Sequence, residues 1–207
     1  CNDLELLKNE NVDVVFMPTV EEMYPKGYDA WVHVGQREGI LEGKHRPFHF
    51  KGVLTVVSKL FNIVRPSRAY FGQKDYQQLT LINQMAVDLN MAVGIVMVPT
   101  IREPDGLAVS SRNILMSKKE RDASSIVYRA LSTGLMLWKN GEHRTNLLIP
   151  EILNVLSQEP LVTSIDYLNI VDSTTLEDLA VVTRNGIVLV ALWVGNIRIV
   201  DNILLQI

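Results

Sequence analysis

The chain has 207 residues, of which 47% are hydrophobic and 21% charged, so it can bury a sizeable core and is neither a disordered tail nor a small disulfide scaffold. Its net charge of −3 leaves no basic surface for nucleic acid, and its four histidines show no metal-ligand spacing. One cysteine cannot form an internal disulfide, which favours a cytoplasmic protein, and the apolar run Ile187–Val194 is far shorter than the ~20 residues of a membrane span.

The first residues predict an alternation of helix and strand. Asp3–Leu7 predicts a short helix, Val12–Phe16 a strand and Trp31–Val34 a second short strand. No secretory signal is visible, and the chain begins with Cys1 in place of Met. We therefore expect an upstream segment of the protein to be missing from this sequence.

The next elements follow one another as helix, strand, helix and strand. Six apolar residues at helical spacing predict a buried helical stripe: Val53, Val56, Val57, Leu60, Phe61 and Val64. A strand at Ala69–Phe71, a helix at Leu79–Leu89 and a strand at Ala92–Val98 come after it. This rhythm predicts a parallel sheet covered by helices, with ligands beyond the carboxyl ends of its strands. We assign residues 1–99 to this α/β domain.

The pattern changes after Pro99. Ser117 and Glu120 have the spacing of a capping box that opens a helix reaching Gly141. Pro150 is expected in the first turn of another helix that ends near Ser157. Three strands follow, at Ile165–Val171, Ile187–Val194 and Ile197–Val200, and Gly195–Asn196 is predicted to form a tight turn between the second and the third. Residues 100–207 are therefore predicted to form a smaller C-terminal α+β domain.

The segment Gly72–Asp75 lies where a predicted strand ends and a helix begins. Free backbone N–H groups, the positive end of the helix dipole and the ammonium of Lys74 would meet an anion there, and nucleotide phosphate is the natural guest. Asp75 would accept hydrogen bonds from ribose, and Gln77 or Gln78 would reach a second, polar substrate. The alternative is that Gly72 only makes the turn and that Lys74 and Asp75 are solvated.

A second group of phosphate donors lies on the loop that ends at Asn113. Ser110, Ser111 and Arg112 offer two hydroxyls and a guanidinium that can wrap a triphosphate. The alternative is a turn-rich approach to a helix. The nearby Met116–Lys119 resembles the Lys-Met-Ser-Lys-Ser loop of aminoacyl-tRNA synthetases, but Ser117 is better explained as a helix cap.

The remaining polar candidates are weaker. Arg46 and His49 flank Pro47 and could contact a carboxylate or phosphate, or could form a surface pair. His33 and His143 are interpreted as structural. The aromatic residues Tyr24, Trp31 and Trp138 are interpreted as core or rim residues, because no basic stripe accompanies them.

Several segments together resemble one family, the pantothenate synthetases or pantoate–β-alanine ligases, over essentially the whole chain. The matching segments are Phe16-Met17-Pro18, Met23-Tyr24-Pro25, Leu41-Glu42-Gly43, Arg46-Pro47-x-His49-Phe50-x-Gly52-Val53, Lys59–Asn62, Phe71-Gly72-x-Lys74-Asp75-x-Gln77-Gln78, Arg102-Glu103-x-Asp105-Gly106-Leu107-Ala108, Ser110–Asn113, Leu192-Trp193-x-Gly195 and Asp201-Asn202. The resemblance implies a Rossmann-like nucleotidyl-transferase sheet with a C-terminal lid domain, in a cytoplasmic homodimer.

The resemblance also implies a reaction. ATP, accompanied by Mg²⁺, and pantoate would give pantoyl adenylate and pyrophosphate, and β-alanine would then displace AMP to yield pantothenate, in the pathway to coenzyme A. Gly72, Gln73, Lys74 and Asp75 would bind ATP, with adenine at the backbone of Ile101. Val109, Ser110, Ser111 and Arg112 would clamp the phosphates, and the catalytic groups would be Lys74, Ser110, Ser111 and Arg112. Gln78, Arg46 and His49 would bind pantoate.

Two departures from the family pattern affect these expectations. The family has a His-x-Gly-His motif whose histidines meet the triphosphate, and this sequence contains none. The family also has Gly where this chain has Phe48, which should disfavour a positive φ and alter the placement of His49. A non-catalytic remnant that binds nucleotide weakly or acts as an interaction module is therefore the alternative. Another adenylate-forming transferase is disfavoured by Gln78 and by the residues around Arg46.

Overall fold

The computed structural model describes residues 2–206, which fall into two compact units divided after Trp31. The first unit holds helices α1 (Asn2–Asn9) and α2 (Val20–Met23). The predicted helix at Asp3–Leu7 is confirmed within α1. The predicted strand at Val12–Phe16 is wrong: this segment is irregular. Its β-branched residues favour an extended chain, but a strand also needs a partner to hydrogen-bond with, and the described part of this unit offers none.

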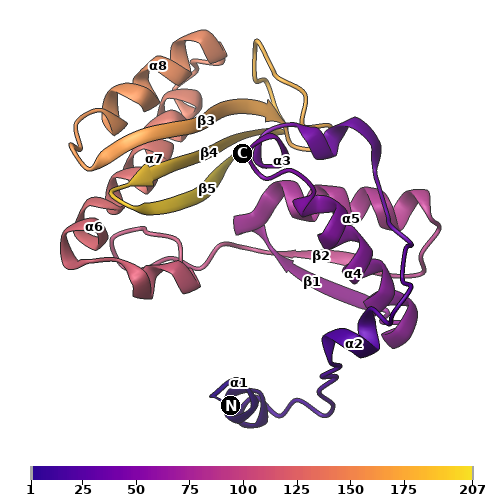
Figure 1. Ribbon diagram of the computed structural model, residues 1–207. Coiled ribbons are helices and arrows are strands. Elements are labelled where there is room, and N and C mark those ends of the chain that lie inside the picture. The colour runs from indigo at the N-terminus through magenta and orange to yellow at the C-terminus, as the bar shows by residue number, and fades with distance from the viewer. Residues whose placement is uncertain (1, 207) are drawn as a thin grey trace. The chain divides into compact units, whose positions relative to one another are not determined.

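The second unit contains two sheets with their helices (Figure 1). Its elements are η1 (Gly35–Gly39), α3 (Glu42–His45), α4 (His49–Val64), β1 (Arg68–Gly72), η2 (Gln73–Asp75), α5 (Tyr76–Asp88), β2 (Gly94–Val98), η3 (Ser111–Leu115), α6 (Lys118–Ala123), α7 (Ser125–Lys139), α8 (Thr145–Leu156), β3 (Val162–Asp172), β4 (Gly186–Val194) and β5 (Ile197–Leu205), where η marks a 3-10 helix. The short strand predicted at Trp31–Val34 is wrong, because side chains take its N–H groups: Val32 donates to Thr55 Oγ1 and Val34 to Glu38 Oε1.

Strands β1 and β2 form a parallel pair, with Gly72 opposite Val98 at its carboxyl end. The predicted helix–strand–helix–strand order is confirmed. Helices α4 and α5 pack beside the strands around a core of Phe50, Leu54, Phe61, Leu81, Ile82 and Met85. Among the described residues the expected cover of helices is present on the face that carries Ala69 and Phe71, whereas Tyr70, which points to the other face, is 62% exposed.

The helix predicted from the stripe at residues 53–64 is confirmed as α4, but its buried face differs. Phe50, Leu54 and Phe61 are buried, whereas Val64 is 54% exposed. The helix begins at His49, four residues before the predicted stripe, and this additional turn adds Phe50 to the core that Leu54 and Phe61 share with residues of α5. Periodicity identified the helix, but the partners of the helix decided which face is buried.

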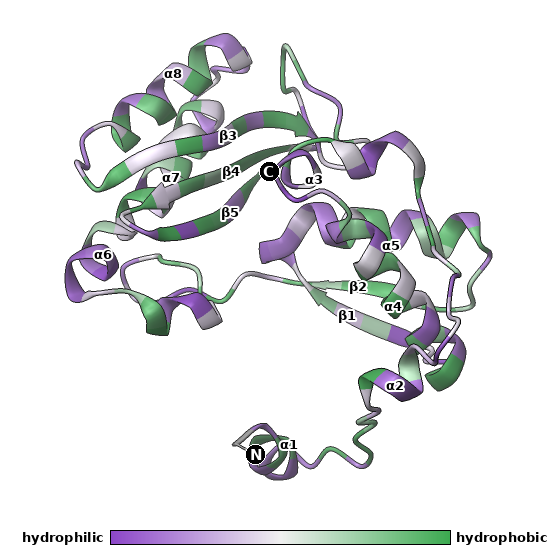
Figure 2. Ribbon diagram, in the orientation of Figure 1, coloured by the Kyte–Doolittle hydropathy of each residue, from purple (hydrophilic) through white to green (hydrophobic). Residues whose placement is uncertain are grey.

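The C-terminal sheet is antiparallel, in the order β3–β4–β5, and α7 and α8 pack beside it. Every β4 residue except Trp193 is buried, and Figure 2 shows β4 as a mostly hydrophobic strand. The three predicted strands are confirmed. Pro150, however, lies inside α8 and not in its first turn, because Leu148, Ile152 and Leu156 form one buried stripe that extends the helix back to Thr145.

The predicted capping box and tight turn are both confirmed, and one side chain connects them. Glu120 accepts a hydrogen bond from the backbone N–H of Ser117, and Ser117 Oγ accepts one from Glu120 N. The other carboxylate oxygen of Glu120 accepts from Asn196 N at 3.0 Å, in the turn between β4 and β5. Gly195 has φ +57° there, and a Cβ at this position would lie 2.4 Å from that oxygen. The predicted helix continues to Lys139 with an interruption at Ser124.

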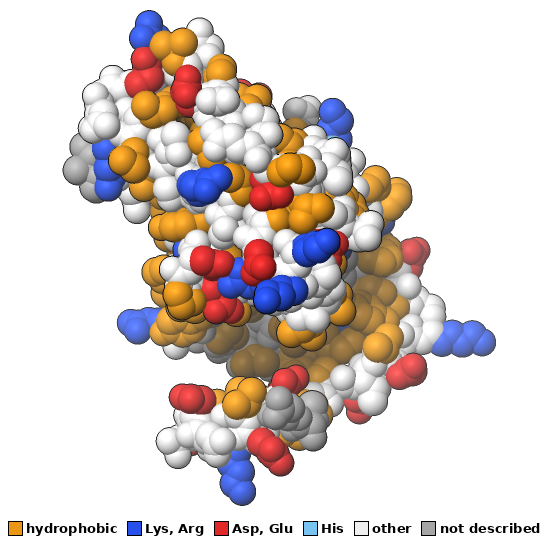
Figure 3. Space-filling model, turned by 90° about the vertical axis from the view of Figure 1, so that its left-hand side faces the viewer, with side chains coloured by type: hydrophobic (Ala, Val, Ile, Leu, Met, Phe, Trp, Pro, Cys, Tyr) orange, Lys and Arg blue, Asp and Glu red, His pale blue; other side chains and the backbone are white. Residues whose placement is uncertain are grey.

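Hydrophobic side chains also reach the surface, where Figure 3 shows them gathered in patches between charged groups. In the second unit they include Ile63, Val64, Tyr70, Val87 and Leu89. Within residues 2–206, none of the helices is long and apolar enough to cross a bilayer.

Candidate functional site

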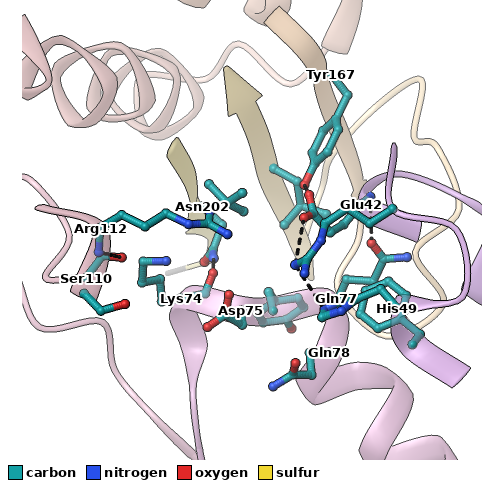
Figure 4. Close-up of a pocket in the computed structure, with 16 residues that line it drawn as sticks. Glu42, His49, Lys74, Asp75, Gln77, Gln78, Ser110, Arg112, Tyr167 and Asn202 are labelled. Carbon is teal, nitrogen blue, oxygen red and sulfur yellow. Dashed lines mark hydrogen bonds and ion pairs between the residues drawn. The ribbon is translucent and has the colours of Figure 1, made fainter. Parts of the chain in front are cut away.

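A cleft of about 210 Å³ lies where the carboxyl end of β1 meets α3, α4, η3 and β5 (Figure 4). Nine of the residues singled out in the sequence line it: Arg46, His49, Lys74, Asp75, Gln77, Gln78, Ser110, Ser111 and Arg112. Ligand pockets usually measure roughly 300–1,000 Å³, so this space is smaller than most of them. The segments around residues 74 and 111 thus face one shared space.

The corner at Gly72–Asp75 joins β1 to α5. Neither the 3-10 turn η2 nor α5 has a side-chain hydrogen bond capping its first turn. No side chain therefore competes with an anion for the N–H groups of this corner. Among residues 2–206, the structure gives the Lys74 side chain no hydrogen bond or ion pair, so its ammonium is equally available.

The loop opposite is ordered by its own polar side chains. Ser110 Oγ accepts a hydrogen bond from Arg112 N at 3.3 Å and starts η3, and Asn113 Nδ2 donates to the Ala108 carbonyl at 3.1 Å. Arg112 donates only a long bond of 3.4 Å to the Arg198 carbonyl. Its exposed guanidinium lies on the same side of the cleft as Ser110 and Lys74 (Figure 4).

The negative charge in the cleft is mostly neutralised. Arg198 donates two hydrogen bonds to Glu42, at 2.7 and 2.9 Å, and one to Asp166 at 2.6 Å, while Arg46 lies 3.6 Å from Glu42. Burial by itself would raise the pKa of Glu42, but the hydrogen bonds and charge of Arg198 outweigh it and hold the pKa below its usual value. Because neither Lys74 nor Arg112 has a carboxylate partner in the described part of the chain, the cleft attracts anions.

His49 lies beside this charge cluster, in surroundings that favour its neutral form. Burial lowers its pKa, and the neighbouring Arg46 guanidinium lowers it further. Arg46 Nη1 lies 3.3 Å from His49 Nε2, and because a guanidinium only donates, this nitrogen accepts and the proton is on Nδ1. The expectation that Phe48 would avoid a positive φ is wrong: its φ is 66°, and its side chain is 83% exposed.

Gln77 and Gln78, the two neighbouring glutamines at the start of α5, differ in their hydrogen bonding. Gln77 is buried; its Oε1 accepts from Glu42 N, and its Nε2 donates to the carbonyls of Arg37 and Ile40, all at 3.0 Å. It therefore fixes the segment before α3. Gln78 is half-buried and lines the cleft, and the described residues give it no hydrogen-bond partner. Of the two, Gln78 is the one available to a ligand.

Four of the expected nucleotide-binding residues do not line the cleft: Gly72, Gln73, Ile101 and Val109. Gln73 turns its amide to Asn202 at 3.1 Å. Ile101 is 68% exposed and Val109 47%, and the Val109 N–H donates to the Ile101 carbonyl at 2.9 Å. The Ile101 carbonyl and the Val109 N–H are thus already bonded to each other, while both residues are exposed.

Residues that the sequence reasoning left without a role also line the cleft, notably Glu42, Tyr167 and Asn202. Glu42 and Asn202 stand in segments that carry the family resemblance, which was the available signal. Three of the residues interpreted as structural have such contacts: Trp138 Nε1 donates to the Val182 carbonyl at 2.7 Å, the Trp138 ring packs edge-on against His143, and Ser117 caps α6.

The comparisons with known proteins agree with one another. A family model described as pantoate-beta-alanine ligase matches residues 1–204. Pantothenate synthetases of Dehalococcoides mccartyi (strain CBDB1) and Thermotoga petrophila are 47% and 48% identical to the chain over 98% of its length, which corresponds to 75% and 72% of theirs.

Solved structures of such enzymes are equally similar. The pantothenate synthetase of Thermus thermophilus superposes with a TM-score of 0.95 at 40% identity, over all of this chain and 74% of that one. A pantoate-beta-alanine ligase of Francisella tularensis, complexed with beta-gamma ATP and beta-alanine, gives 0.75 at 31% identity over 98% and 69%.

Proposed function

The chain belongs to the pantoate–β-alanine ligase family, and we propose that the cleft between Lys74 and Arg112 is where it activates pantoate with ATP before joining it to β-alanine. The observation that carries this proposal is the meeting of two cations that lack carboxylate partners with Gln78 around one enclosed space. The two cations would bind the phosphates of ATP, and the amide of Gln78 would bind the polar acid pantoate.

In the first step a carboxylate oxygen of pantoate attacks the α-phosphorus of ATP, and the bond from this phosphorus to the bridging oxygen breaks to release pyrophosphate. Lys74 and Arg112, with the hydroxyls of Ser110 and Ser111, are proposed to hold the phosphates and stabilise the charge on the leaving group. Gly72, Gln73 and Asp75 would bind ribose and phosphate, and Ile101 and Val109 would contact the adenosine end. Holding two anions in line is the main task of such a site.

The acid substrate is proposed to lie on the opposite side of the cleft. Gln78 would hydrogen-bond to pantoate, Arg46 would neutralise its carboxylate, and His49, neutral with its proton on Nδ1, would donate to it. In the second step the amine of β-alanine attacks the acyl carbon, the bond to the adenylate oxygen breaks, AMP leaves and the nitrogen loses a proton.

Mg²⁺ is proposed to enter with ATP. Within residues 2–206 there is no group of three His, Cys, Asp or Glu that could hold a metal by itself, which suits an ion bound mainly by phosphates and water. The residues of the cleft would therefore act on the ion through the phosphates that carry it, and Asp75 stays assigned to ribose. When bound, the ion would neutralise phosphate charge.

The remaining proposals follow from the family. We propose a cytoplasmic homodimer whose product serves the pathway to coenzyme A. We also retain the division into a nucleotide-binding domain (1–99) and a lid domain (100–207). The residues that line the cleft come from both parts, which supports a lid closing over the nucleotide.

Calorimetric titration of ATP onto the chain and onto Lys74→Ala and Arg112→Ala variants tests the site. Each variant should weaken ATP binding at least tenfold, because a charge-assisted hydrogen bond to phosphate is lost. Arg144→Ala is the matched control, since Arg144 is exposed and pairs with Glu142 outside the cleft. Unchanged affinity in both cleft variants, or an equal loss in the control, would refute the proposed site.

Pantoate-dependent exchange of pyrophosphate into ATP tests the chemistry. Because this sequence has no His-x-Gly-His, we expect the chain by itself to exchange slowly; the loss of one preorganised donor costs on the order of 10² in rate. Exchange that requires pantoate supports the ligase activity at any rate, whereas exchange indifferent to pantoate contradicts it.

A further inference from the structure

Asn202 in β5 is buried, at 1% exposure, and it lies next to the corner Gly72–Asp75, which carries Lys74 (Figure 4). Its Nδ2 donates hydrogen bonds to the carbonyls of Gln73 and Lys74, at 2.9 and 3.0 Å. Its Oδ1 accepts from Gln73 Nε2 at 3.1 Å. Both amide hydrogens of Asn202 are thus directed at two successive backbone carbonyls of η2.

The corner depends on these bonds because it has little other support. The first turns of η2 and α5 have no side-chain cap, and none of the β1 residues before them is buried. A 3-10 turn of three residues has few internal hydrogen bonds to hold it. The backbone angles at Lys74, and hence the direction of its side chain, are therefore set from outside, by a side chain of β5.

The neighbour of Asn202 holds the other side of the cleft. Asp201, also 1% exposed, forms two hydrogen bonds with Arg102, at 2.7 and 2.9 Å, and Arg102 also donates to the Gly106 carbonyl at 3.0 Å. Arg102 further lies over the ring of Tyr128. Successive side chains of a strand point to opposite faces, so β5 anchors the loop leading to Ser110 on one face and the Lys74 corner on the other.

We propose that Asn202 is a positioning residue of the ligase reaction: it holds the backbone of Gln73 and Lys74 so that the Lys74 ammonium and the N–H groups of the corner meet the ATP phosphates together. The inference deepens the proposed function and rests on it, since Asn202 acts through Lys74 and needs no contact with the substrate.

A double-mutant cycle tests this coupling. Asn202→Ala should raise the Kd for ATP about tenfold, because the loss of two buried hydrogen bonds frees the corner. Because part of the effect of Asn202 passes through the Lys74 side chain, Asn202→Ala should weaken ATP binding by clearly less than tenfold when Lys74 is already alanine. Additive losses would overturn the proposal.

Val188→Ala provides the control for a merely structural effect. Val188 is fully buried in the adjacent strand of the same sheet and does not line the cleft, so its truncation lowers stability without touching the corner. The Kd for ATP of this variant should stay at the unmodified value. An equal loss of affinity in Val188→Ala and Asn202→Ala would reduce Asn202 to a structural residue.

Amide hydrogen exchange without nucleotide separates this inference from the proposed function. Asn202→Ala should speed exchange in a peptide covering residues 70–78 at least tenfold, and Val188→Ala should not. If Asn202→Ala does not fold, Gln73→Ala, which removes the reciprocal bond from the partly exposed side, should produce a smaller change of the same kind. Unchanged exchange at the corner overturns the positioning role. If Lys74→Ala leaves ATP binding intact, the proposed function fails instead, and the exchange result still decides the role of Asn202.

Discussion

The two sheets of the second unit differ in how deeply their strands are buried. In β4 every residue except Trp193 is buried, whereas no residue of β1 or β2 is. The proposed phosphate-binding corner nevertheless stands at the end of β1, on the less buried sheet. Strand β5 of the buried sheet supports it through Asn202. A well-packed sheet can thus provide precision for a site that a neighbouring, more open sheet carries.

The largest expected effect is on the buried sheet itself. Leu192→Ala, at a fully buried position of β4, should lower the free energy of unfolding by about 3 kcal/mol through lost burial and a cavity. The exposed Tyr70 of β1 is the counterpart, and Tyr70→Thr should change stability by less than ~0.5 kcal/mol. Denaturant unfolding measures both. Equal losses would remove the contrast between the sheets.

A smaller loss of unfolding free energy is expected at the ion pair that connects Glu42 of α3 with Arg198 of β5. Arg198→Met leaves Glu42 partly buried without its main partner, and should cost about 2 kcal/mol in unfolding free energy. Adding Glu42→Gln to Arg198→Met removes the unpaired charge, so the double variant should regain part of the loss. A double variant that is less stable than Arg198→Met would show that the cost does not come from the charge of Glu42.

A substitution of Phe48, at the start of α4 beside the open sheet, is expected to raise the free energy of unfolding, in contrast to the losses above. Phe48→Gly should stabilise the protein by about 1 kcal/mol, because an L-residue at φ 66° is strained and glycine is not. Phe48→Ala removes the exposed ring but keeps the strain, so it should leave stability nearly unchanged. Thermal unfolding distinguishes the two variants, and equal shifts in both would assign the effect to the ring.

The smallest expected effect is a pH dependence. Because Arg198 holds the pKa of Glu42 below its usual value in the folded state, the unfolded chain binds the proton more readily. Stability from this pair is therefore complete above about pH 4.5 and declines as the pH falls through the lower folded value. Unfolding measured from pH 7 to pH 3 should show a shallower decline in Glu42→Gln. Parallel curves would exclude Glu42 as a source.

The sequence predicted best what depends on neighbours along the chain. The capping box at Ser117, the helix at His49–Val64 and the strands of the C-terminal sheet all follow from local spacing. The error at Val12–Phe16 has the opposite origin, because an apolar run shows that a strand is favoured and not that a partner strand is present. Pro150 was misplaced because a stripe of buried leucine and isoleucine outweighs the missing hydrogen bond.

The same distinction applies to the site. Lys74, Ser110 and Arg112 were predicted because their residue types suit phosphate and stand at a strand end or on a polar loop. The sequence could not predict that Gln77 is bonded inside the protein while Gln78 is available in the cleft, because this depends on which amide faces the carbonyls of residues 37 and 40. Asn202, 128 residues beyond Lys74, carries no chemical signal of its own role.

The adjacency of Asp201 and Asn202 makes the site sensitive to how the final hairpin assembles. A slip of one residue between β4 and β5 would exchange the faces of these two side chains, turning the carboxylate toward the carbonyls of the corner and the amide toward Arg102. Both anchors would fail together. A misregistered molecule would therefore retain much of its secondary structure but lose the proposed phosphate-binding geometry, so the proposed site depends on the correct pairing of β4 with β5.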